Sequence, residues 1–152
     1  MNRRAFVFGS LATGACLLAS RPVLSIAGTG GIDLKSAFGA ATEPDIVRAL
    51  FGDAQPQNTD QIELDLPMVA NGQKVTVKVH TELADVDAIA ITVPGNERPL
   101  CAFYRPMRDA ASVFETAVRL RQTSAVTAYV RSRGQVFVRR RLVKLAVSGF
   151  GS

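Results

Sequence analysis

The sequence of 152 residues contains no tryptophan, one histidine and two cysteines. A blue-copper site needs two histidines and a cysteine, and a structural zinc site needs four cysteine or histidine ligands. With His80 as the single histidine, neither site can be assembled, so we expect no metal and no other cofactor. His80 also falls on the polar side of an alternating segment, which predicts a solvated surface residue.

The same scarcity argues against catalysis. Nucleophilic catalysis requires a base beside the nucleophile, and Cys101 with His80 is the one conceivable pair. Cys101 lies in the apolar run 99–103, where a cysteine is expected to be a buried and inert filler. The acidic residues are scattered, and no two carboxylates are paired by sequence. We therefore predict a protein that is not an enzyme.

The first 27 residues have the pattern of an export signal. Arg3 and Arg4 precede the apolar stretch 6–19, which is too short and too rich in small residues for a stable membrane span. The paired arginines followed by apolar residues resemble a twin-arginine signal. Small residues before position 28 predict cleavage after Ala27 and a periplasmic mature protein. Cys16 would suit a lipoprotein, but Thr13 stands where a lipobox has a large aliphatic residue.

Removal of this segment changes the charge and the cysteine count. Three of the 18 basic residues would be lost, which leaves 15 against 13 acidic residues and a weak electrostatic case for nucleic-acid binding. Cys101 would be the remaining cysteine, so the mature chain could form no intramolecular disulfide. The fold must then be stable through its core alone.

The mature chain divides into three parts. Residues 28–60 are expected to be a linker with one short helix, which begins with acidic residues and a proline at 43–45 and ends at Gly52. Residues 61–147 carry strand patterns separated by turns. The segments with strand character are 62–66, 74–83, 87–93, 100–104, 113–120, 125–131 and 135–147.

These patterns predict an all-β fold. About seven short strands with alternating faces, and no helical pattern between them, favour an immunoglobulin-like antiparallel β-sandwich. Alternation is clearest in residues 74–83, where three valines alternate along the chain with threonine, lysine and histidine. Without a tryptophan or a cysteine pair, the domain is not of the antibody type.

A dense basic run, Arg139 to Arg141, lies inside the last predicted strand. One interpretation is a solvated strand edge, where charges block unwanted pairing. The other is a contact surface for an acidic partner or an anion.

The chain ends in an arm, residues 148–152, in which glycines flank an aromatic residue. Gly149 and Gly151 permit many backbone conformations on either side of Phe150. A disordered tail is one interpretation. The alternative is that the arm presents Phe150 to a partner.

Taken in order, these features resemble the SoxY family, the sulfur-carrier subunit of periplasmic thiosulfate oxidation. The resemblance covers nearly the whole chain and depends on the order of several segments. They are the twin-arginine-like signal, the helix around 45–51, the segment 62–72 (IELDLPMVANG), the strand 74–83 and the glycine-containing end.

The resemblance implies an immunoglobulin-like sandwich in the periplasm and a heterodimer with a second sandwich protein, SoxZ. The family's carrier end reads Gly-Gly-Cys-Gly-Gly, and its cysteine holds sulfur intermediates covalently. Here the central glycines persist as Gly149 and Gly151, the outer ones are replaced by Ser148 and Ser152, and Phe150 occupies the cysteine position. A carrier needs a thiolate, so the covalent activity is not expected to carry over.

Three hypotheses follow. The leading one is a non-covalent binding or scaffold subunit that pairs with a SoxZ-like protein or with an intact relative, with other periplasmic sulfur-oxidation proteins as further candidate partners. The second is an active carrier that uses Cys101. The third is a generic periplasmic interaction module outside sulfur metabolism.

Overall fold

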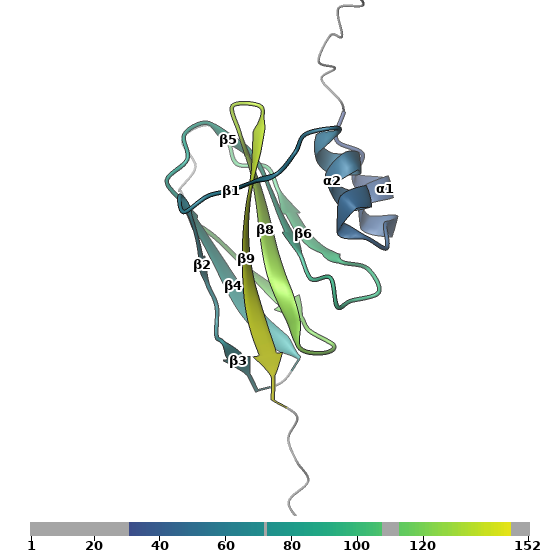
Figure 1. Cartoon of the computed structure of the whole chain (residues 1–152), viewed down its shortest axis with the longest axis vertical. Coiled ribbons are helices and arrows are strands. Elements are labelled where there is room, and N and C mark those ends of the chain that lie inside the picture. Colours follow the sequence, from purple (N-terminus) through teal and green to yellow (C-terminus); the bar gives the residue numbers. More distant parts are fainter. Residues whose placement is uncertain (1–30, 72, 108–112, 147–152) are drawn as a thin grey trace, which may run out of the picture.

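The computed structural model describes residues 31–71, 73–107 and 113–146, which form a β-sandwich with a helical layer on one side (Figure 1). One sheet has the strand order β1-β9-β8-β5-β6, with β3 also paired to β9, and the other has the order β2-β4-β7. The elements are α1 (Leu34–Gly39), α2 (Glu43–Phe51), β1 (Gln57–Asn58), β2 (Ile62–Asp65), β3 (Val69–Ala70), β4 (Lys74–Thr81), β5 (Val86–Thr92), β6 (Leu100–Tyr104), β7 (Val113–Arg119), β8 (Ser124–Ser132) and β9 (Gln135–Leu145).

The smaller sheet, β2-β4-β7, follows the alternation of its sequence. In β4 every second residue is buried, and Val75, Val77 and Val79 point into the core between the two sheets. The intervening residues face solvent, among them His80, as predicted. Because a strand's side chains alternate between the two faces of the sheet, one face packs on the core and the other is exposed to solvent.

The larger sheet is covered on both faces. Its inner face contributes Ile91 and Val130 to the core between the sheets. Its outer face contributes Ala90 and Tyr129 to a second apolar cluster, which is completed by α1 and α2. Burial on two sides explains why β5 is continuously buried from Ala88 to Thr92.

Helix α2 has the ends that its sequence predicts. The Thr42 side chain caps the helix by accepting a hydrogen bond from the Asp45 backbone N–H. Pro44 lies in the first turn, and Gly52 ends the helix with a positive φ of 68°. Ile46 and Leu50 are its most deeply buried residues.

Helix α1 was not predicted. It has six residues, is capped by the Asp33 side chain and buries Ala37 against the second cluster. Leu34, Ala37 and Phe38 are spaced as on one face of a helix, but the segment is short, and Leu34 and Phe38 remain 41% exposed while Ala37 is buried. Residues 31–60 therefore hold two helices and β1, where one short helix was expected.

Two short strands were also not predicted, so the sandwich has nine strands in its described part where about seven were expected. The chain pairs with β9 through β1, crosses to the smaller sheet as β2, and returns to β9 as β3. The pairings of β1 and β3 with β9 are parallel, and the other strand pairs of the described residues are antiparallel. The predicted immunoglobulin-like all-β sandwich is confirmed.

Candidate functional site

The last strand is firmly held up to the point where the C-terminal arm begins. β9 pairs with β8 from Gln135 to Val143. Beyond that, the backbone N–H groups of Lys144 and Ala146 donate to the carbonyls of Met68 and Ala70, both at 2.9 Å. The predicted arm residues Ser148, Gly149, Phe150, Gly151 and Ser152 lie outside the described part of the chain. What the structure fixes is the place from which they depart.

Exposed apolar side chains surround this point of departure. Met68 is 70% exposed, Val69 54% and Leu142 55%. Val69 is in register with Lys144 in a parallel pair, so it shares a face with Lys144 and with Leu142 two residues earlier. We call Met68–Ala70 and Leu142–Ala146 the arm base. It lies at the end of the sandwich away from the helices (Figure 1).

Cys101 lies in β6, an edge strand of the larger sheet, and is partly buried against the core. Its Sγ is 3.4 Å from the Pro99 carbonyl oxygen, to which the thiol donates, and 3.7 Å from Asn96 Nδ2, from which it accepts. Burial raises the pKa of the thiol, and the Asn96 hydrogen bond only partly opposes this. The residue is thus less enclosed than a core filler, but its thiol is not activated.

Cys101 and His80 do not form a catalytic pair. His80 is exposed on the outer face of the smaller sheet, whereas Cys101 packs toward the core from the larger sheet. The described residues contain no group of three or more histidine, cysteine or acidic side chains that could hold a metal ion. No helix within the described ranges is long and apolar enough to cross a membrane.

The basic run Arg139 to Arg141 is used inside the molecule. Arg139 Nη1 donates to Asp60 Oδ1 at 2.8 Å, and Arg141 Nη1 donates to the Leu64 carbonyl oxygen at 2.8 Å. Both contacts tie β9 to the segment that crosses between the sheets. All three arginines are exposed, as the interpretation of a solvated run expected, but neither interpretation anticipated these contacts within the protein.

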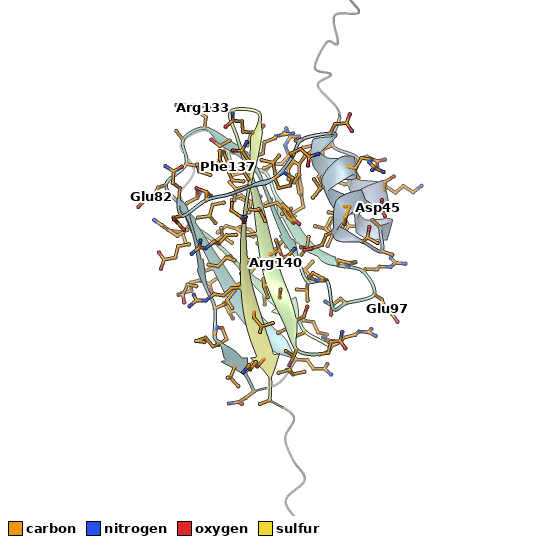
Figure 2. The ribbon with its side chains drawn as sticks, in the orientation of Figure 1. Asp45, Glu82, Glu97, Arg133, Phe137 and Arg140 are labelled. Atoms are coloured by element: carbon orange, nitrogen blue, oxygen red, sulfur yellow. The ribbon has the colours of Figure 1, made fainter. Side chains whose placement is uncertain are left out.

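Arg140 points to the other face of β9 and binds the start of α2. Its Nη2 donates to Glu43 Oε2 at 2.6 Å and its Nε to Thr127 Oγ1 at 3.1 Å. Thr92 donates to the other Glu43 oxygen. Figure 2 labels Arg140 midway along β9.

Arg140 and Tyr129 also line a cleft of about 370 Å³ between α2 and the larger sheet, and sequence analysis did not find this cleft. Its other walls are residues of α2 and of the segment that follows it. Burial raises the pKa of the Tyr129 hydroxyl, the Glu43 carboxylate adds to the rise, and Arg140 opposes it. The lining combines charged, polar and apolar side chains.

Comparison with known proteins gives a consistent result. The family profile described as "Sulfur oxidation protein SoxY" matches residues 47–149. Among solved structures, the sulfur carrier protein SoxY from Chlorobium limicola f thiosulfatophilum is 26% identical, with a TM-score of 0.63 over 68% of this chain and 96% of that one. No curated protein matches the sequence.

A superoxide reductase (neelaredoxin) from Ignicoccus hospitalis is also similar in structure. It is 14% identical, with a TM-score of 0.50 over 58% of this chain and 82% of that one, which shows a shared fold alone. The profile match, in contrast, spans more than half of the chain, from α2 through β9. The chain belongs to the SoxY family of sulfur oxidation proteins.

Proposed function

We propose that this protein is a non-covalent subunit of a periplasmic system for oxidising sulfur compounds such as thiosulfate, and that it pairs with a SoxZ-like sandwich protein. It would act by binding and positioning partners and would carry no sulfur itself. Export by the segment 1–27 would bring it to the compartment in which such a system works.

The observation that carries the proposal is the identity of residue 150. A sulfur carrier must offer a thiolate that can attack, or be attacked at, sulfur. Phe150 has no such atom, and the resemblance to the family aligns it with the cysteine of the family's arm. An aromatic side chain there can contribute apolar contact area to a partner's cleft.

Cys101 offers no ready substitute. Its thiol is partly buried and has a raised pKa, so little thiolate forms at neutral pH. It also belongs to a strand that is hydrogen-bonded to β5, which fixes its position in the sheet.

The arm base supports the choice of partner surface. Met68, Val69 and Leu142 expose apolar side chains next to the strand end from which the arm departs. Exposed apolar patches on soluble domains are typical of protein–protein contacts. A partner seated there would hold the arm close to its own surface.

Co-purification tests the proposal. The protein, recovered from its native cells under mild conditions, should bring with it a SoxZ-like protein at a fixed ratio. Intact mass spectrometry should find the chain without added sulfur. Recovery without any SoxZ-like or sulfur-oxidation protein contradicts the pairing.

One observation favours a second candidate, an active carrier that uses Cys101. The loop before Cys101 lies at the arm-base end of the sandwich, because Gly95 N–H donates to Ser124 Oγ at 3.0 Å and Ser124 is in register with Val143. The strand of Cys101, β6, is separated from β9 by three strand spacings, roughly 14 Å. Sulfur added to Cys101 in cells oxidising thiosulfate would support this candidate, and an unmodified thiol would exclude it.

A further inference from the structure

The cleft beneath α2 is separate from the arm base and from Cys101. It is lined by Glu43, Pro44, Val47, Arg48, Gly52, Asp53, Ala54, Gln55, Pro56, Tyr129 and Arg140. Its volume of about 370 Å³ lies within the range of small-molecule sites. The floor belongs to the sheet and the walls to α2 and to the segment 52–56, so the shape is formed by packed elements.

The cleft is lined by donor side chains as well as by two carboxylates and the Gln55 amide. Arg140 uses Nε and Nη2 within the protein, and its guanidinium also lies within hydrogen-bonding reach of the Tyr129 hydroxyl, so it presents its charge to the cleft. Arg48, in the next turn of α2, has its nearest acidic oxygen on Asp45 at 4.0 Å, which is a weak and exposed contact. The Tyr129 hydroxyl adds a third donor.

The acceptors of the cleft are largely occupied or exposed. Both Glu43 oxygens already accept hydrogen bonds, from Thr92 and from Arg140. Asp53 is the other carboxylate of the lining, and it lies exposed at the rim. A cation would find no free carboxylate at the floor, whereas an anion would find guanidinium donors.

The remaining lining combines the Gln55 side chain with several apolar residues. Pro44, Val47, Ala54 and Pro56 present hydrocarbon surface beside the donors. A bare inorganic anion would leave most of this volume unfilled. A ligand with one oxyanion head and a compact apolar body fits both the charge and the volume.

We propose that this cleft binds a small organic anion, with its carboxylate or sulfonate head on Arg140 and Arg48 and its apolar body against the proline and valine walls. The site is independent of the proposed pairing with a SoxZ-like protein. It neither requires sulfur transfer nor contributes to it.

Binding can be measured by calorimetry or by chemical-shift changes with benzoate and benzenesulfonate as probes. Benzamide serves as the neutral analogue of matched shape, and sulfate as the head group alone. Both organic anions should bind more tightly than benzamide and than sulfate at equal ionic strength. Equal binding of benzamide and benzoate, or binding of sulfate as tight as that of benzenesulfonate, overturns the proposal.

Variants sharpen the test. Arg48→Gln should weaken anion binding about tenfold, because it removes a charged donor. Arg140→Gln should weaken it at least as much, provided that circular dichroism shows the variant folded. Arg121→Gln is the matched control, because Arg121 is an exposed arginine outside the lining.

Glu43→Gln gives the most specific outcome. It removes the negative charge that faces Arg140, so anion affinity should rise by about threefold or more even though the protein becomes less stable. A purely structural role for the cleft would predict weaker binding or no change. An affinity unchanged in Arg48→Gln and lowered in Glu43→Gln would refute the site.

Discussion

The carboxylate of Glu43 and the guanidinium of Arg140 are joined at 2.6 Å across 97 positions of sequence. The Glu43 side chain is 12% exposed, and Thr92 holds its second oxygen. Arg140 is in turn held by Thr127. This network fixes the first turn of α2 to the outer face of the larger sheet, so it connects the helical layer to the sandwich and shapes the cleft beside it.

Glu43→Gln should lower the free energy of unfolding by about 1–2 kcal/mol, because a hydrogen bond between charged groups becomes a weaker neutral one in a largely buried place. Denaturant titration measures the change. Glu97→Gln is the matched control: Glu97 meets Arg121 at 3.8 Å with its side chain 83% exposed, and its loss should cost little. Equal effects of the two substitutions would show that the network adds no stability.

Gly95→Ala should destabilise the sandwich by about 1–3 kcal/mol through crowding. A Cβ at residue 95 would stand 2.9 Å from both Cβ and Oγ of Ser124. It would also strain the hydrogen bond from Gly95 N–H to that oxygen. Gly39→Ala is the control, since a Cβ there meets nothing within 4 Å. Thermal unfolding of the two variants should differ clearly, and equal midpoints would contradict the close approach.

Cys101 should react with iodoacetamide more slowly in the folded protein than in the unfolded chain at neutral pH. Burial raises its pKa above the ordinary value of 9.0, so the folded state keeps the proton longer. The stability that this provides is complete below the ordinary pKa and is lost as the pH rises through the folded pKa. Cys101→Ser should remove that part of the alkaline decline in stability. Faster alkylation of the folded protein would contradict a buried, protonated thiol.

Leu142→Glu should weaken binding of a SoxZ-like partner at least about tenfold while leaving the free energy of unfolding nearly unchanged, because Leu142 is already exposed at the arm base. Leu34→Glu, on α1 and 41% exposed, is the matched control and should bind normally. Partner capture with purified proteins measures both. Equal binding by the two variants would place the contact away from the arm base.

The fold was largely predictable because most strands can be recognised in the sequence by their alternation of apolar and polar residues or by the turn residues that flank them. The hairpin at Arg133 and Gly134 is an example: both residues adopt positive φ, at 50° and 77°, where the sequence predicts a turn. In the helical layer, α2 was predicted from its ends, whereas α1 and the packing of both helices on the larger sheet were not. The cluster between the helices and the sheet joins Ile46 and Leu50 of α2 to Ala90 and Tyr129 of the sheet, and no local pattern shows that these segments meet.

The sites were less predictable than the fold. The cleft depends on Glu43 and Arg140, which no local pattern connects, and on Tyr129 from a third segment. The arginine run of β9 was interpreted as a solvated edge or a surface for a partner. Its contacts with Asp60 and Leu64 form because the segment that crosses between the sheets lies against β9 in the folded chain. The prediction at Phe150 stays a prediction, because it depends on the resemblance to the family and the residue lies outside the described part of the chain.

The intact mass of the protein recovered from cells that are oxidising thiosulfate tests the central claim most directly. A Phe150→Cys variant from the same cells serves as the positive control, because it returns a thiol to the arm. We expect the native chain at its unmodified mass and the variant with added sulfur. A persulfide or thiosulfonate adduct on the native chain, at Cys101 or elsewhere, would contradict the account.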